Sequence, residues 1–277
     1  MHRLALTACI VLLAVPGSGE DYLDDAEIMT AFETGLDTLF KKGGVPSAST
    51  TLRQLRREAR TDATLPSPAA PPADPIAAAR SATLVFGHLY YCAECKQNHS
   101  SIASGVLVSP DGLALTNYHV LDANGAIVFG AMTLDGRLFA IEEVLASAKK
   151  DDLALVRLRD AADMPFVSLT PTPASGTELF VVSHPDAFFY SLTRGYLARK
   201  YLDEDKAPRL QITADFAKGS SGSGVFDLQG RLFGLSASTT SIYYEDKHEE
   251  FDDLQMVVKS AVPSESIRKL FGKEGGE

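Results

Sequence analysis

Three residue types in this sequence can carry out nucleophilic catalysis, and they occur at separate places along the chain. Ser221 lies in a Gly-Ser-Ser-Gly string at residues 219–222, where the glycines permit backbone angles that other residues resist. A serine hydroxyl needs a base to accept its proton, and His119, at the end of an apolar run, is a candidate. An acid fixes the tautomer of such a base, and the candidates are Asp151 and Asp152. This set predicts attack on a carbonyl group through a covalent intermediate.

The order of these residues and the residues that flank them are both informative. His, Asp, Ser is the chain order of chymotrypsin-type enzymes, not of subtilisin or the α/β-hydrolases. The strings Thr-Asn-Tyr-His-Val at 116–120, Asp-Leu-Ala-Leu-Val at 152–156 and Gly-Ser-Ser-Gly-Ser at 219–223 resemble motifs of trypsin-like serine peptidases. The likeness is strongest to the bacterial peptidases related to HtrA, and it covers residues 81–272. Each motif alone is weak, but three in the right order are specific.

The resemblance implies a role for each residue of the site. The family places its acid directly before Leu-Ala, so Asp152 is expected to orient His119, which takes the proton of Ser221. The oxyanion hole would use the backbone N–H groups of Gly219 and Ser221, with that of Ser220 close by. The implied activity is that of a serine endopeptidase that forms an acyl-enzyme, without cofactor or metal. The alternative is a non-catalytic or latent binding protein on the peptidase fold.

The resemblance also suggests where substrate specificity is set. Asp215 stands six positions before Ser221, the offset of the acid at the base of the trypsin pocket. This implies cleavage after Arg or Lys. The pocket walls would be Ser236, Ala237 and Ser238, and Ser238 falls where trypsin has a glycine, so a long side chain could be blocked.

From residue 83 onward the sequence consists of short apolar, β-branched runs separated by turn signals. Such a pattern predicts a β-sandwich or barrel. The resemblance selects an all-β fold of two packed six-stranded antiparallel β-barrels, with His119 and Asp152 on the first, Ser221 on the second and the site between them. Residues 264–271 are expected to form a closing C-terminal helix. The few residues after Phe271 leave no room for a PDZ domain, so PDZ-based peptide sensing is not expected.

The residues before the predicted peptidase domain, 81–273, divide into three segments. Residues 1–19 have a short basic start, an apolar middle and small residues at the end, which predicts a signal peptide cleaved after Gly19. A membrane anchor is the alternative, although the apolar run is short for a bilayer. Residues 20–64 show helical spacing of apolar residues and form a pro-segment, a docking element or a plain spacer. Residues 65–80 read as a stiff Pro/Ala-rich linker.

The composition restricts the partners. The formal charge of −10 argues against a nucleic-acid-binding protein, which usually carries a basic face. No stretch after the leader is long and apolar enough to cross a membrane, so the mature chain is expected to be exported to the periplasm or secreted, without stable membrane insertion. The expected partner is a protein or peptide substrate. The acidic run at 245–253 predicts a hairpin near the mouth of the pocket, or simply a solvated loop.

Two cysteines remain after removal of the leader, in the string Cys92-Ala-Glu-Cys95. In an exported protein an even pair predicts a disulfide, here within a hairpin. A redox pair, free thiols and a zinc site are the alternatives. His99 permits the zinc site, but the sequence shows no clear fourth ligand. Of the other histidines, His184 is expected to be structural.

Overall fold

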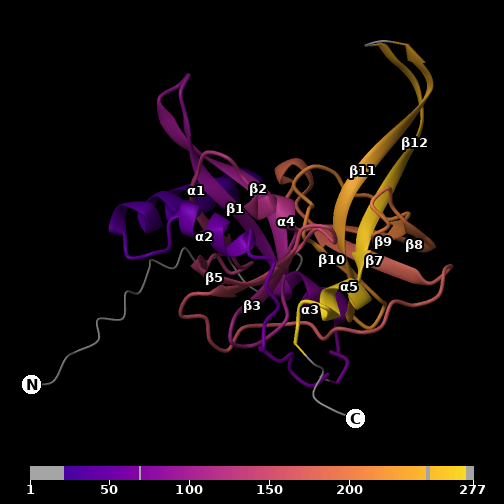
Figure 1. The fold of residues 1–277 in the computed structure, drawn as a ribbon, viewed down its shortest axis with the longest axis horizontal. Coiled ribbons are helices and arrows are strands. Elements are labelled where there is room, and N and C mark those ends of the chain that lie inside the picture. The colour runs from indigo at the N-terminus through magenta and orange to yellow at the C-terminus, as the bar shows by residue number, and fades with distance from the viewer. Residues whose placement is uncertain (1–21, 69, 248–249, 273–277) are drawn as a thin grey trace, which may run out of the picture.

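A computed structural model describes residues 22–68, 70–247 and 250–272, and two closed six-stranded antiparallel β-barrels form most of it (Figure 1). The first barrel contains β1 (Thr83–Cys92), β2 (Gln97–Leu107), β3 (Leu113–Thr116), β4 (Ala126–Met132), β5 (Leu138–Ala148) and β6 (Leu153–Leu158). The second contains β7 (Glu178–Ser183), β8 (Ser191–Leu202), β9 (Pro208–Ile212), β10 (Gly224–Phe226), β11 (Leu232–Lys247) and β12 (Glu250–Pro263). The strands are ordered β1-β2-β3-β6-β5-β4 in one barrel and β10-β11-β12-β9-β8-β7 in the other. The predicted fold class is confirmed.

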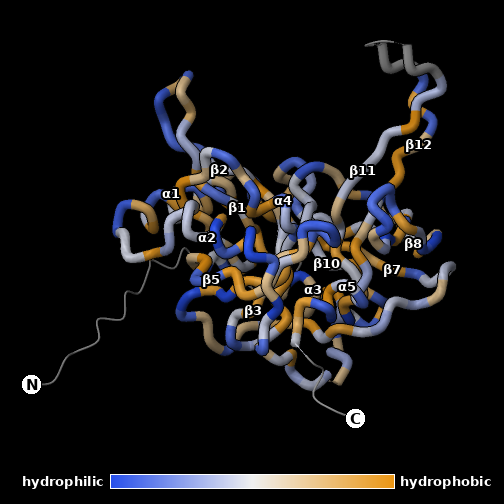
Figure 2. The backbone as a smooth tube through the Cα atoms, in the orientation of Figure 1, coloured by the Kyte–Doolittle hydropathy of each residue, from blue (hydrophilic) through white to orange (hydrophobic). Residues whose placement is uncertain are grey.

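The barrels are held together by a shared apolar core. Figure 2 shows apolar residues along the strands of both barrels. One contiguous cluster joins Phe86 and Phe129 of the first barrel to Phe180 and Phe226 of the second, and the last two rings stack with centroids 5.3 Å apart. A separate cluster fills the interior of the second barrel. Because burial of such rings is a large part of folding free energy, the contact between the barrels is a stable one.

The N-terminal segment forms two helices that pack on the first barrel, α1 (Asp25–Lys42) and α2 (Ala48–Leu55). Asp24 caps α1 by accepting hydrogen bonds from two backbone N–H groups of the first turn. Phe32, Leu36 and Leu55 are completely buried. The interpretation of this segment as a spacer is therefore wrong, because its apolar stripe is part of the core of the first barrel.

We predict that Phe32→Ala destabilises the whole domain by about 3–5 kcal/mol, the usual cost of truncating a buried aromatic ring. The matched control is Phe40→Ala on the same helix, where the ring is 48% exposed. An exposed site of this kind changes stability by about 0.5 kcal/mol or less. Urea unfolding of the two variants measures the difference. Equal, small effects would contradict the packing of α1 on the barrel.

The chain between α2 and β1 crosses from one barrel toward the end of the other. The Thr61 N–H donates to the Leu270 carbonyl at 2.9 Å, and Thr61 forms a parallel bridge with Phe271. Helix α3 (Pro75–Ala82) then begins inside the segment predicted as linker, because Asp74 caps it and Pro75 suits a first helical turn. The predicted C-terminal helix is present as α5 (Ser264–Arg268), one turn shorter than expected.

Two hairpins rise above the barrels in Figure 1, one from β1 and β2 and one from β11 and β12. The second confirms the hairpin predicted for the acidic run, with Lys247 paired to Glu250 across its tip. The predicted signal peptide lies outside the described residues. Among the residues that are described, no helix is long and apolar enough to cross a bilayer.

Candidate active site

His119 and Asp152 are brought together by the pairing of β3 with β6. Thr116, at the end of β3, is paired with Ala154 near the start of β6. His119 follows β3 on the short helix α4 (Tyr118–Leu121), and Asp152 immediately precedes β6. The His119 Nδ1 atom lies 3.0 and 2.9 Å from the two carboxylate oxygens of Asp152. The backbone N–H of His119 donates to the same carboxylate at 3.1 Å.

The two candidate acids have different surroundings. Asp152 adopts a left-handed backbone conformation, with φ of 60°, and its carbonyl accepts a hydrogen bond from Asn117 Nδ2 at 2.9 Å. The Asp151 carboxylate instead accepts from Ser266 Oγ of α5 at 3.2 Å. A carboxylate on Nδ1 selects the imidazole tautomer whose Nε2 can accept a proton. Asp152 is the acid that can do this for His119.

The serine loop of the second barrel is held against the first. The Ser104 N–H donates to the Ser221 carbonyl and the Ser104 hydroxyl donates to the Gly219 carbonyl, both at 2.9 Å. Gly222 has φ of 86°, and a Cβ there would lie 2.3 Å from the Ser104 carbonyl oxygen. Thr116 Oγ1 donates to that same carbonyl at 2.9 Å. These contacts place the serine loop beside the end of β3, which leads into the helix that carries His119.

The Ser221 hydroxyl is not bonded to the imidazole. Its Oγ lies 3.4 Å from the carbonyl oxygen of Ala237. In the described part of the chain no hydrogen bond joins it to His119. Catalytic hydrogen bonds between a base and a nucleophile often tighten only with substrate bound.

The loop before Ser221 contains the residues expected to form the oxyanion hole. The Lys218 carbonyl accepts a hydrogen bond from the Asp186 N–H at 2.6 Å. Within the described residues no acceptor engages the N–H groups of Gly219 and Ser221, which are thus free to bind an anion. The expectation that Ser220 contributes is corrected, because its N–H donates to the Ala217 carbonyl at 3.0 Å. Its buried hydroxyl donates to Ser183 Oγ at 3.0 Å, which anchors the loop.

Comparison with known proteins agrees with this geometry. Residues 103–235, which contain His119, Asp152 and Ser221, match the model of the trypsin-like peptidase domain family. This part of the chain is therefore similar to trypsin-like peptidase domains. Several of its relatives are DegP-like proteins. A probable periplasmic DegP-like serine endoprotease from Marinomonas sp. (strain MWYL1) is 29% identical over 143 residues, which are 50% of this chain and 30% of that protein.

A second DegP-like protein, from Hahella chejuensis, is 30% identical over 146 residues, 51% of this chain and 30% of its own length. The chain thus matches less than a third of the length of these relatives. Among solved structures, the HtrA-type protease AlgW with a tripeptide has a TM-score of 0.57 at 22% identity, covering 71% of this chain and 61% of that one. A variant of AlgW with a decapeptide has a TM-score of 0.56 at 18% identity, covering 70% and 63%. These structures share the trypsin-like fold.

In the trypsin-like domain His184 is structural, as expected. It is completely buried, its Nδ1 accepts the Tyr190 N–H at 3.0 Å, and its carbonyl oxygen would lie 2.3 Å from a Cβ on Gly219. Burial lowers the pKa of His184 to about 4, and the Leu84 backbone offsets this in part. His184 therefore remains neutral and supports the serine loop through its backbone.

We predict that this histidine makes the trypsin-like domain less stable in acid. The unfolded chain binds the proton near the ordinary pKa of 6.5, and the folded chain only near 4. The contribution of His184 is thus complete above the unfolded value and is lost as pH falls toward the folded value. Between about pH 7.5 and pH 5 the loss is about 2 kcal/mol. Urea unfolding should show this slope in the wild type and a weaker slope in His184→Gln, whose amide oxygen can still accept the Tyr190 N–H.

The structure corrects the expected role of Asp215. Its side chain is 86% exposed and lies 3.6 Å from Lys259 Nζ. The Lys259 ammonium also donates to the Phe216 carbonyl at 2.7 Å. An exposed carboxylate with its own cationic neighbour does not provide the buried negative floor that a basic side chain requires. Of the expected walls, Ser236 and Ala237 are buried and Ser238 is exposed.

A cavity of about 590 Å³ adjoins Gly219. Its lining includes Lys218 and Asp186 near the serine loop, His88 of β1 and Met29 of α1. Sequence reasoning missed Met29 as a lining residue of this cavity, because its apolar spacing indicates only the buried face of a helix. Burial lowers the pKa of His88.

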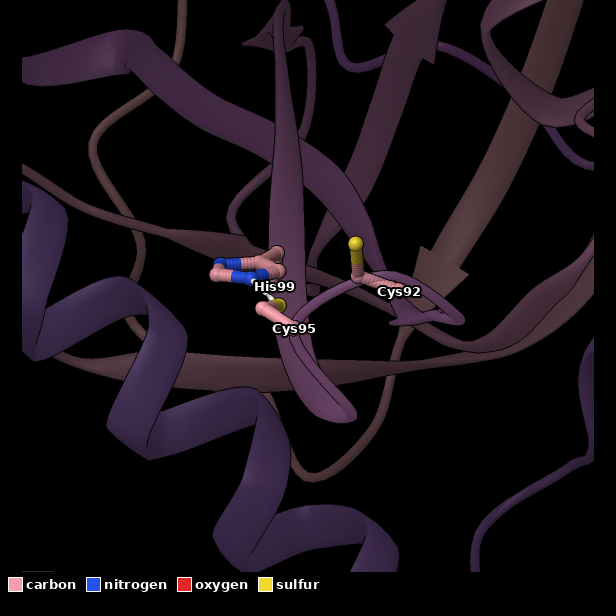
Figure 3. Close-up of side chains that lie close together, drawn as sticks. All are labelled: Cys92, Cys95 and His99. Carbon is pink, nitrogen blue, oxygen red and sulfur yellow. Dashed lines mark hydrogen bonds between the residues drawn. The ribbon is translucent and has the colours of Figure 1, made fainter.

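The disulfide predicted for Cys92 and Cys95 is not formed in this structure, in which both are free thiols. They lie at the tip of the β1–β2 hairpin, together with His99 (Figure 3). The tip is stabilised by a turn, in which the Lys96 N–H donates to the Cys92 carbonyl at 2.9 Å.

Proposed function

We propose that the chain is an exported serine endopeptidase that uses His119, Asp152 and Ser221. The observation that carries the proposal is the pair of contacts between His119 Nδ1 and the Asp152 carboxylate, at 3.0 and 2.9 Å, next to a serine loop with two free N–H groups. A base with a fixed tautomer, a nucleophile and anion donors are the three parts that acyl transfer requires. The trypsin-like domain supports the same chemistry.

The mechanism follows from the roles of these groups. Ser221 Oγ attacks the peptide carbonyl while His119 Nε2 accepts its proton, and Asp152 stabilises the imidazolium that results. The N–H groups of Gly219 and Ser221 stabilise the oxyanion. His119 then donates the proton to the leaving amine, which leaves an acyl-enzyme on Ser221. Water, activated by His119, attacks the ester and releases the acid product.

The relatives support the choice of substrate and compartment. Two of them are described as probable periplasmic serine endoproteases, and the AlgW structures hold a tripeptide or a decapeptide. We therefore propose a protein or peptide substrate. Export follows from the leader predicted for residues 1–19, and the periplasm is the proposed destination.

The surroundings of Ser221 favour a small, uncharged residue on the acyl side of the cleaved bond. Ser236 and Ala237, the proposed walls of the pocket, have small side chains. Asp215, the carboxylate expected at its base, lies 3.6 Å from the Lys259 ammonium and is therefore already paired with a positive charge. A peptide-library cleavage profile tests this preference, and cleavage confined to Arg and Lys sites would contradict it.

A latent form of the enzyme is the second candidate function. The hydrogen bond from Ser221 Oγ to the Ala237 carbonyl, at 3.4 Å, holds the hydroxyl away from His119. A peptide bound along β11 would compete for that carbonyl and release the hydroxyl. In this form the protein binds peptides and cleaves them only after the serine has turned.

Labelling with a fluorophosphonate probe tests the proposed function. The probe should label the wild type and not Ser221→Ala. The matched control is Ser223→Ala, which removes a buried hydroxyl without a hydrogen-bond partner and should label normally. Absence of labelling in folded wild-type protein would contradict a competent triad. Labelling that appears only after addition of peptide would identify the latent form.

A further inference from the structure

The tip of the β1–β2 hairpin gathers three side chains that bind soft metal ions. The ligand atoms of Cys92, Cys95 and His99 all lie within 4.8 Å of one another. Cys95 Sγ is 2.9 Å from His99 Nε2. Figure 3 shows the Cys95 side chain against the His99 ring with Cys92 beside them. Tetrahedral zinc separates such ligand atoms by about 3.5–3.8 Å, as follows from bonds of about 2.3 Å to sulfur and 2.0 Å to nitrogen.

This arrangement follows from the register of the hairpin. Tyr90 is paired with His99 and Cys92 with Gln97. Cross-strand partners share a face of the sheet, so Cys92 and His99 are diagonal neighbours on the same face. Lys96 adopts a left-handed conformation, with φ of 60°, and this tight turn brings Cys95 back toward both.

Helix α1 fixes the strand that carries His99. Asn98 Nδ2 donates to the Asp37 carboxylate at 3.2 Å, and the Ser100 N–H donates to Glu33 Oε2 at 3.0 Å. The residues on either side of His99 are therefore tied to the helix, while the imidazole points to the cysteines. Ligands held in place before the ion arrives lose little conformational entropy when it binds.

An aromatic side chain flanks the imidazole of this cluster. The rings of Tyr90 and His99 lie with centroids 6.0 Å apart, so Tyr90 shields one side of the imidazole.

We propose that Cys92, Cys95 and His99 bind a thiophilic divalent cation, in the first place Zn²⁺, at the tip of this hairpin. Two sulfur donors and one imidazole select such ions over Mg²⁺ or Ca²⁺. Cys95 is exposed, which leaves a fourth position for water or for a side chain of another molecule. The bound ion would join the two strands at the point where their hydrogen-bonded ladder ends.

Cobalt titration of the full chain under reducing conditions tests this site. A Cys9→Ser background removes the remaining thiol. We expect one Co²⁺ per chain with thiolate-to-metal charge-transfer absorption, and displacement of the cobalt by Zn²⁺. Cys92→Ser, Cys95→Ser and His99→Ala should each weaken binding by about 100-fold or more, since even outer partners cost about 10–100-fold. Gln97→Ala, an exposed non-ligand on the same hairpin, should leave binding unchanged.

Three results would overturn the proposal. The first is cobalt binding without a thiolate charge-transfer band, and the second is equal affinity in the wild type and the Cys92→Ser variant. The third is that protein isolated from the compartment to which it is exported contains a disulfide between Cys92 and Cys95 and no bound metal. Circular dichroism of each variant ensures that loss of binding is not loss of the fold. Fluorophosphonate labelling of Ser221 reports on the peptidase independently of the metal.

Discussion

Asp152→Asn is expected to lower kcat for peptide cleavage by about 10⁴-fold, the loss that this replacement causes in a serine peptidase triad. The reason is that an amide at position 152 can present its NH₂ group to His119 Nδ1. Nδ1 then becomes the acceptor, and Nε2 carries the proton and cannot act as a base. The volume of the side chain is unchanged, so the loss is catalytic. Steady-state kinetics with the best peptide of the library profile measures it.

Asp151→Asn is the matched control for this experiment. Its carboxylate accepts from Ser266 Oγ at 3.2 Å, and an amide oxygen can accept the same bond. The variant should therefore keep most of its activity. Equal losses in the two variants would contradict the assignment of Asp152, and loss only in the Asp151 variant would reverse it.

Gly219→Ala is expected to reduce kcat by about 10²–10³-fold, the effect of losing one oxyanion donor. A Cβ at this position would lie 2.3 Å from the His184 carbonyl oxygen, and the φ of 93° is one that alanine resists. The peptide between Lys218 and the new alanine must turn, which removes its N–H from the site. His184 cannot retreat, because it is completely buried.

The control for Gly219→Ala is Gly176→Ala. Gly176 has a similar φ of 91°, but a Cβ there has no heavy atom within 4 Å. This variant shows the backbone strain without the clash, and it should retain full activity with a modest loss of stability. A Gly219→Ala enzyme with an unchanged kcat would show that the Gly219 N–H does not bind the oxyanion.

The fold and the proximity of His119 to Asp152 could be predicted because they depend on local patterns. Strand-length apolar runs indicate barrels, and the flanks of His119, Asp152 and Ser221 are short motifs. Asp215 was misjudged for a different reason. Its offset from Ser221 resembles that of a pocket acid, but Lys259, whose ammonium lies 3.6 Å away, comes from a distant strand that no local pattern connects to it.

The details of the serine loop were also out of reach of the sequence. Whether the N–H of Ser220 is available depends on a turn to Ala217 that only the folded loop shows. The rotamer of Ser221 depends on the Ala237 carbonyl. Similarly, helical spacing indicates that α1 has an apolar face, but not that this face completes the first barrel. The spacing of apolar residues shows which face of a helix must be buried, but it does not show which part of the protein covers that face.

The bond between Thr61 and Leu270 has a mechanical consequence. The residues before Thr61 are anchored on the first barrel through α2, and Leu270 follows α5, which packs on the second barrel. The hydrogen bond therefore connects the N-terminal segment to the far side of the interface between the barrels. His119 lies on the side of the first barrel and Ser221 on the side of the second. Such a connection limits how far the barrels can move relative to each other, and therefore limits changes in the distance between His119 and Ser221. Cleaving the chain in this segment would make the candidate active site more mobile without altering any residue in it.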